Sequence, residues 1–322
     1  MRLLPALATA ILCLGGLLAP AWAGVDAEAS KACVKCHDAE DLPDMRRSAH
    51  AQASDPRSPG CISCHGPSQN HLNKPSGGDR PPPDIAFSRN GGAKAAERNA
   101  ACLGCHDRDA KRALWGGSQH DVANVACSSC HKVHVNHDKA LAKATQAEVC
   151  YSCHKEQRAQ LQRPSRHPVP EGKMTCSDCH NAHGSAGPKL ASRSSTNDTC
   201  YSCHAEKRGP FVHAHEPVAE NCANCHNPHG STVAGLLKAR APMLCQQCHT
   251  PHVASNVAAL GGQRGVFGPA APGQAAPAIG AFTGGKNVVT MTQGRSCMNC
   301  HTQVHGSNNP STTNPTPGFL FR

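Results

Sequence analysis

Twenty of the 21 cysteines lie in one pattern, Cys-x-x-Cys-His, which occurs ten times. Two thiols at this spacing are one helical turn apart, so they can add to the two vinyl groups of one porphyrin ring. The histidine that follows is then held under the ring, where its imidazole binds the iron. This pattern is the attachment signal of c-type haem, and the sequence therefore predicts ten covalently bound haems.

The predicted attachment residues form two sets. The thioether cysteines are Cys33, Cys36, Cys61, Cys64, Cys102, Cys105, Cys127, Cys130, Cys150, Cys153, Cys176, Cys179, Cys200, Cys203, Cys222, Cys225, Cys245, Cys248, Cys297 and Cys300. The proximal iron ligands are His37, His65, His106, His131, His154, His180, His204, His226, His249 and His301.

Other uses of paired cysteines explain the pattern less well. A disulfide scaffold, common in exported proteins, gives no reason for a histidine after every second cysteine. Zinc ribbons and thioredoxin-type redox sites use Cys-x-x-Cys pairs, but neither needs the trailing histidine. The repeated histidine therefore favours haem over all three alternatives.

The number of histidines separates catalysis from electron transfer. Twelve of the 22 histidines lie outside the motifs, which is enough to give each of ten irons a second axial ligand. A six-coordinate iron has no open position for a substrate, whereas a catalytic haem needs one. The count therefore predicts an electron-transfer protein rather than an enzyme.

Spacing indicates some of these distal ligands. His134, His183, His229 and His252 lie three residues after a motif histidine, and His305 lies four residues after one. A side chain so close to the proximal ligand is on the same side of its own ring, so we expect it to bind the iron of a neighbouring haem. The other candidates are His50, His71, His120, His167 and either His213 or His215, with His137 in surplus. Methionine is the alternative axial ligand and would raise a haem's potential; the candidates are Met45, Met174, Met243, Met291 and Met298.

The motifs must be positioned by a repeated unit. Motifs four and five, six and seven, and eight and nine form three pairs, with first cysteines 23, 24 and 23 residues apart. Such units stack on their neighbours rather than fold alone. We expect a helical turn at each motif, helices over 93–101 and 140–149, and loops over 74–92 and 260–285. Prolines near 164–170 place a boundary between two pentahaem halves, 24–165 and 166–322.

The composition leaves little material for a core of side chains. Leu, Ile, Val and Phe together number 46 of 322 residues, a share typical of chains that cannot offset the entropy of folding. The haem faces must therefore supply the apolar interior. The predicted fold is a multihaem cytochrome, mostly loops with short α-helices around a covalent haem core, with little or no β-structure, in an elongated array of two pentahaem halves.

Residues 1–23 read as a signal peptide that ends in Ala-Trp-Ala, although a retained anchor is the alternative. The net charge of +10 does not indicate nucleic acid, because each ferric haem with its propionates contributes about −1. Residues 221–322 contain no Asp or Glu. We interpret this end as lying inside another protein, where free charges would be desolvated; compositional drift in a loop-rich segment is the alternative.

Beyond the ten motifs, longer segments closely resemble the MtrA/DmsE-type decahaem cytochromes of extracellular electron transfer, a family with metal-reducing and Fe(II)-oxidising members. These segments are WGGSQHDVANVACSSCHKVHV (115–135), MTCSDCHNAHGS (174–185), NDTCYSCHAEKRGP (197–210), ENCANCHNPHGS (220–231), LCQQCH (244–249) and GRSCMNCHTQVHGSN (294–308). The chain departs from the family in its short segment before Cys33 and its longer insertion around 262–285.

The resemblance implies bis-histidine ligation, an elongated haem wire and insertion into an outer-membrane β-barrel partner of the MtrB type, with the C-terminal haems facing outward. The distal ligands that it implies are His50, His71, His120, His134, His167, His183, His215, His229, His252 and His305. His137 and His213 have no counterpart in the family.

The expected function is electron conduction across the outer membrane, whose hydrocarbon core of about 30 Å no single haem spans. The direction of flow is not encoded. Further expected partners are an extracellular multihaem cytochrome and periplasmic or inner-membrane cytochromes, and no nucleic acid. The alternatives are a soluble periplasmic electron carrier and, less favoured, a multihaem oxyanion reductase, which would need a vacant haem.

Overall fold

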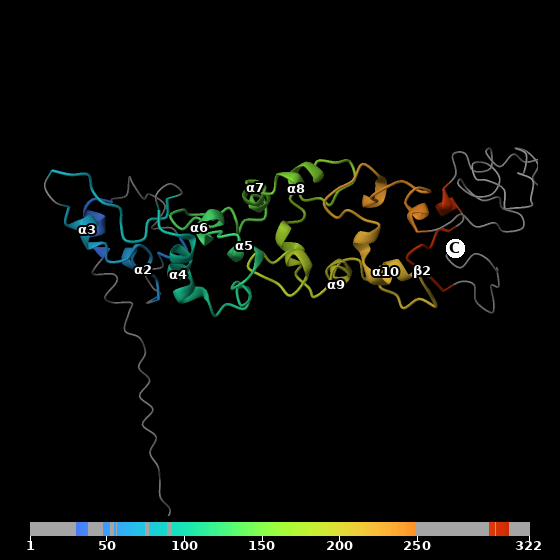
Figure 1. The fold of residues 1–322 in the computed structure, drawn as a ribbon, viewed down its shortest axis with the longest axis horizontal. Coiled ribbons are helices and arrows are strands. Elements are labelled where there is room, and N and C mark those ends of the chain that lie inside the picture. Colours follow the sequence, from blue (N-terminus) through green and yellow to red (C-terminus); the bar gives the residue numbers. More distant parts are fainter. Residues whose placement is uncertain are drawn as a thin grey trace, which may run out of the picture. The chain divides into compact units, whose positions relative to one another are not determined.

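A computed structural model describes residues 30–37, 48–51, 55, 57–74, 77–88, 92–248, 296–299 and 301–308. Short helices joined by loops make up this part of the chain (Figure 1). The α-helices are α2 (Cys61–His65), α3 (Gln69–Leu72), α4 (Ala95–His106), α5 (Gln119–Val122), α6 (Cys127–Cys130), α7 (Gln146–Tyr151), α8 (Lys155–Gln160), α9 (Thr196–Tyr201) and α10 (Glu216–Glu220).

Single turns of 3₁₀ helix supply most of the remaining regular structure. They are η1 (Cys33–Lys35), η3 (Cys176–Asp178), η4 (Pro188–Leu190), η5 (Ala205–Lys207), η6 (Cys222–Asn224), η7 (Ala234–Leu236), η8 (Cys245–Gln247) and η9 (Cys297–Asn299). Strands β1 (His213–Ala214) and β2 (Gly306–Ser307) pair antiparallel, with His213 opposite Ser307. The predicted class, mostly loops with short helices and little β-structure, is confirmed.

Each described motif forms the expected helical turn. In seven motifs the backbone N–H of the motif histidine donates to the carbonyl oxygen of the first cysteine at 2.8–3.0 Å; these motifs end at His37, His131, His154, His180, His204, His226 and His301. The motifs ending at His65 and His106 lie in α2 and α4. This one closed turn brings the two thiols and the imidazole to one side of the backbone.

Of the two longer helices expected, the first is confirmed. Helix α4 covers most of 93–101 and continues through the third motif to His106. Its N-terminus is capped because Glu97 accepts the backbone N–H of Lys94 at 2.8 Å. Four of its twelve residues are Ala, the best helix former.

The helix expected over 140–149 was wrong in its first half, since α7 begins only at Gln146. The Thr145 hydroxyl donates to the carbonyl of Lys139 at 2.9 Å, and the Gln146 amide donates to that of Ala140 at 3.1 Å. These side chains occupy carbonyls that a helix would bond through its own backbone, so the segment forms turns instead.

Side chains supply only a small apolar interior, as the composition predicts. The buried apolar residues among those described are Trp115, Ala126, Tyr151, Leu161, Leu190 and Ala191. Several polar side chains are as deeply buried, including Asn99 and Asn197. Buried polar groups require hydrogen-bond partners, and the bonds of these two asparagines join neighbouring motifs.

Asn99 and Asn197 each lie three residues before the first cysteine of a motif. The Asn99 Oδ1 accepts the backbone N–H of Cys127 at 2.8 Å, and the Asn197 Oδ1 accepts that of Cys222 at 2.7 Å. Ser30, at the same position before Cys33, accepts the N–H of Cys61 at 2.8 Å. At motifs one, three and seven, a side chain at this position therefore clamps the motif to the even-numbered motif that follows.

Packing divides the chain into two compact units. Unit 1 comprises 1–105 and 126–138, and unit 2 comprises 106–125 and 139–322. The boundary between pentahaem halves at 165/166 stays a prediction, and the signal peptide lies outside the described residues. Within the described ranges, no helix is long and apolar enough to cross a membrane.

Asn197→Ala is expected to destabilise the haem-loaded protein by about 1–3 kcal/mol, because it leaves a partly buried N–H and two carbonyls, those of Val218 and Ala219, without this partner. Urea unfolding followed by circular dichroism measures the change. Asn73→Ala is the control: Asn73 is exposed and its one side-chain bond is to Gln69, so its effect should stay within about 0.5 kcal/mol. Equal effects of the two substitutions would contradict the clamp.

Candidate haem-binding sites

The motif thiols lie next to one another in pairs. The first cysteines of motifs one and two, three and four, five and six, seven and eight, and nine and ten share side-chain hydrogen bonds; the pairs are Cys33–Cys61, Cys102–Cys127, Cys150–Cys176, Cys200–Cys222 and Cys245–Cys297. The described cysteines form no disulfides. Two attachment points therefore meet at each pair.

Burial and this pairing shift the thiol pKa values. Burial, reinforced by the neighbouring thiol, raises the pKa of Cys200 and of Cys245 to about 11. The hydrogen bond from Cys150 lowers the pKa of Cys176 to about 7. The shifts have opposite signs because a thiolate is penalised by burial and stabilised by a donor.

A second set of thiols lies close enough across these pairs for their charges to influence one another. Charge interaction links Cys64 to Cys102 in unit 1, and Cys179 to Cys200 and Cys225 to Cys248 in unit 2. Motifs one to four are thus connected in unit 1, and motifs five to ten in unit 2. The sequence predicted that motifs six and seven, and motifs eight and nine, are neighbours; the neighbour relation of motifs two and three and the first kind of pair appear only in the structure.

Six motif histidines each face a histidine from another segment. In every case the ring centroids are 6.0–6.3 Å apart. The pairs are His37 with His71, His65 with His134, His154 with His120, His180 with His229, His204 with His167, and His226 with His305.

The nearly constant distance between ring centroids indicates that the rings are held apart by an atom bound between them. The interplanar angle varies from 10° to 71° among the six pairs, whereas rings in direct contact change their separation as they pass from stacked to edge-on. An imidazole nitrogen binds a metal at about 2.0 Å, with the ring centroid about 1.1 Å behind it, so two imidazoles across one ion have centroids about 6.2 Å apart at any rotation about their common axis. The six pairs fit one axially ligated iron each.

In several of these histidines a hydrogen bond fixes the outer ring nitrogen. Seven histidines donate from Nδ1 to a backbone carbonyl at 2.7–3.0 Å, which leaves the Nε2 lone pair for iron. They are His65, His71, His120, His167, His180, His215 and His226. His131 differs, because its Nδ1 lies 2.6 Å from a carboxylate oxygen of Asp138.

In unit 2 these bonds form a repeated contact. The carbonyls that accept from His120, His167 and His215 are those of Ala182, Pro228 and Val304. Each of these residues directly precedes another predicted distal ligand: His183, His229 and His305. The bond that orients one distal histidine therefore also positions the backbone of the next.

Gly-Ser follows all three of these histidines, and the glycine allows a close backbone approach after His183 and His229. Gly184 and Gly230 have φ values of +122° and +156°. A Cβ atom at Gly184 would lie 1.9 Å from the carbonyl oxygen of Leu114, and one at Gly230 would lie 2.0 Å from that of Gln160. The backbone contact leaves no room for a side chain, so glycine is required at both positions.

The protonation states of two histidines and several buried polar atoms without hydrogen-bond partners also agree with haem binding. Burial lowers the pKa of His229 and of His305, which favours the neutral imidazole that binds iron. The buried Nε atoms of Arg98 and Arg166 and the Tyr151 hydroxyl lack a hydrogen-bond partner among the described residues. Donors of this kind suit the propionate groups of haem.

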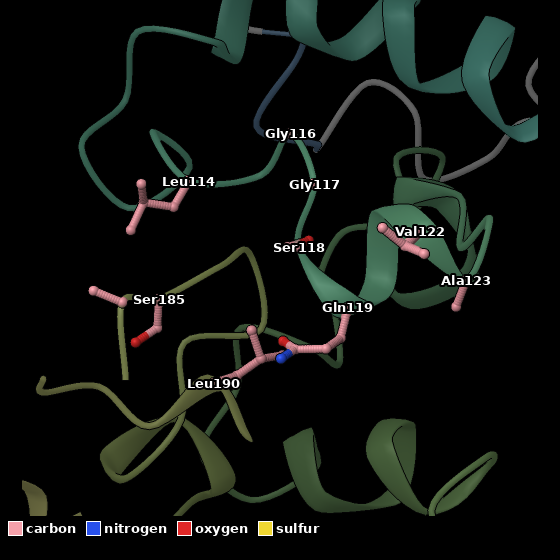
Figure 2. Close-up of a pocket in the computed structure, with 10 residues that line it drawn as sticks. Leu114, Gly116, Gly117, Ser118, Gln119, Val122, Ala123, Ser185 and Leu190 are labelled. Carbon is pink, nitrogen blue, oxygen red and sulfur yellow. The ribbon is translucent and has the colours of Figure 1, made fainter. Parts of the chain in front are cut away.

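An open hollow of about 540 Å³ flanks the sites in unit 2 (Figure 2). Leu114, Val122 and Leu190 give it an apolar surface, and Gln119 lies beside His120 in α5. The lining contains neither a thiol nor an imidazole. The hollow is therefore not an attachment site.

The remaining predicted ligands stay predictions. The described ring contacts do not assign partners to His50, His106, His131, His183, His215 or His301, although the His183 ring lies 6.5 Å from that of Trp115. Cys300, His249 and His252 lie outside the described residues. Of the surplus histidines, His137 is exposed and His213 lies in β1.

Gly230→Ala is expected to lower the free energy of unfolding by at least about 2 kcal/mol, because the added Cβ forces the 227–230 turn away from Gln160. Urea unfolding of the haem-loaded protein measures it. At Gly78 nothing lies within 4 Å of an added Cβ, so Gly78→Ala is the control and should change stability by less than about 0.5 kcal/mol. A tolerated Gly230→Ala would show that the turn does not need this contact.

Comparisons with known proteins agree with these sites. The doubled CXXCH motif model matches residues 167–209 and 215–254, which confirms the pairing of motifs six and seven and of motifs eight and nine. The model described as cytochrome c-type protein NrfB-like matches residues 61–144. Cytochrome c-type protein NrfB of Escherichia coli O6:H1 (strain CFT073) is 30% identical over 136 residues, 39% of this chain and 66% of that protein.

A longer match covers most of the chain. Multihaem cytochrome MtrA of Shewanella baltica (strain OS185) is 46% identical over 287 residues, which is 87% of this chain and 78% of that protein. The chain therefore belongs to the family of the multihaem cytochrome MtrA, and it is an electron-transfer protein that holds c-type haem covalently at its CxxCH motifs.

Proposed function

We propose that this protein carries ten bis-histidine haems and conducts electrons across the outer membrane inside a β-barrel partner of the MtrB type. The observation that carries the ligation is the separation of 6.0–6.3 Å in six histidine pairs. Haem iron supplies one-electron chemistry, alternating between the ferric and ferrous states. The histidines hold both axial positions, so the site favours electron transfer over binding a substrate.

The two kinds of thiol contact support conduction along the chain. Each haem is joined to its motif by two thioether bonds, so adjacent first cysteines, such as Cys200 and Cys222, bring two ring edges together. Thiols of successive pairs that influence each other electrostatically, such as Cys225 and Cys248, bring the next haem alongside. An electron that enters one motif therefore has a neighbouring haem as its next acceptor within each unit.

The charge distribution supports a barrel partner. Residues 221–322 contain no acidic residue, and isolated charges are costly where a surrounding protein excludes water. We propose that this end lies within the barrel and faces outward, and that residues 1–23 direct export to the periplasm. Further proposed partners are an extracellular multihaem cytochrome at the outer end and periplasmic or inner-membrane cytochromes at the other.

Replacement of one distal ligand tests the ligation. His229→Ala should open the iron at His180 and convert one haem to a high-spin form that binds carbon monoxide, because no second imidazole remains opposite it. Ferric electron paramagnetic resonance and carbon monoxide difference spectra measure the change.

His137→Ala is the matched control, since His137 is an exposed histidine outside the proposed ligands, and it should leave the spectra low-spin. A fully low-spin His229→Ala protein would refute the pairing. High-spin haem in the unaltered protein would instead favour the reductase alternative.

Reconstitution tests the conduit. The protein and its barrel partner are placed in liposomes that contain a reductant, and an impermeant acceptor is added outside. Reduction of the acceptor is expected only with both proteins present, because the bilayer core of about 30 Å blocks direct transfer. A protein that never associates with a barrel and reduces only acceptors on its own side would be a soluble periplasmic carrier.

A further inference from the structure

His131 has a neighbour unlike those of His65, His180 and His226. Its Nδ1 lies 2.6 Å from the Asp138 Oδ2, whereas His65, His180 and His226 donate to backbone carbonyls at 2.7–3.0 Å. The Asp138 side chain is 13% exposed and that of His131 is 33% exposed. The bond is therefore a short, charge-assisted contact largely shielded from water.

A carboxylate acts on an iron-bound imidazole more strongly than a carbonyl does. It pulls on the Nδ1 proton, which makes Nε2 a stronger donor to the metal. It also adds a full negative charge close to the iron. Both effects stabilise the ferric state over the ferrous state, and hydrogen bonding to the axial ligand is one of the means by which a protein sets a haem potential.

The other charged neighbours of motif histidines differ from Asp138. At His204 the nearest carboxylate, Glu206, lies 3.8 Å from Nδ1 with 60% of its side chain exposed, too far for a hydrogen bond. At His106 a guanidinium nitrogen, Arg112 Nη2, lies 3.4 Å from Nδ1, and this guanidinium is itself paired with Asp109. At His131, by contrast, a carboxylate accepts directly from Nδ1.

We propose that Asp138 sets the haem of the fourth motif to a lower potential than haems whose proximal histidine donates to a carbonyl. This inference rests on the proposed ligation by His131. The reduction concerned adds one electron to ferric iron, taken from a neighbouring haem, and breaks no bond. Asp138 acts through His131, so it is a positioning residue that tunes the site without touching the iron.

Asp138→Asn tests the proposal because it keeps an oxygen that accepts from Nδ1 and removes the charge. In a spectroelectrochemical titration of the full haem-loaded protein, one haem at the low end of the potential range should move upward while the others stay in place. The electron paramagnetic resonance signal of that ferric haem should also change, because the axial ligand field at its iron becomes weaker. Asp138→Glu should restore much of the original titration.

Glu206→Gln is the matched control, since it removes one negative charge near a proximal histidine without a hydrogen bond, and its shift should be clearly smaller. The inference is overturned if the two variants shift the haem reduction potential equally, or if Asp138→Asn does not shift it. This holds even when every haem remains low-spin. High-spin haem in the unaltered protein would overturn the proposed function instead, so the two failures are distinguishable.

Discussion

The structure depends on a fixed separation between two imidazoles that come from different segments of the chain. Each of the six pairs joins a motif histidine to one well outside its motif, with centroids 6.0–6.3 Å apart. With an iron bound between its two rings, as we propose, such a pair acts as a crosslink. Because few apolar side chains are buried, crosslinks of this kind and the clamps from Asn99 and Asn197 take over the role that a core has elsewhere.

Two kinds of neighbour alternate along the chain. One is visible as the spacing of motifs in the sequence and is matched by the doubled CXXCH model. The other arises where first cysteines meet, as in Cys150–Cys176. Their alternation gives each attachment site within a unit, except the two at its ends, a neighbour on both sides, which is what conduction needs. A charge beside one axial ligand, as at Asp138, then allows one haem to differ from the others in reduction potential. The geometry of the sites stays the same.

Sequence and structure agree most closely where a feature is local. The motif turns and helix α4 lie where they were expected, because cysteine spacing and alanine content act within a few residues. The helix expected over 140–149 fails where Thr145 and Gln146 bond to earlier carbonyls. The clamps were missed, although their signal was present: a serine or asparagine three residues before Cys33, Cys102 and Cys200.

The sequence by itself determined the chemistry, because ten CxxCH motifs and 22 histidines specify how haem is attached and how many ligands are available. It also indicated that a histidine close behind a motif serves another haem. Only the tertiary structure decided which ring faces which, for example His229 opposite His180 and His305 opposite His226. The reason is physical: any free imidazole can bind iron, so the partner is chosen by close backbone approach, as at Gly230, which residue type and spacing do not specify.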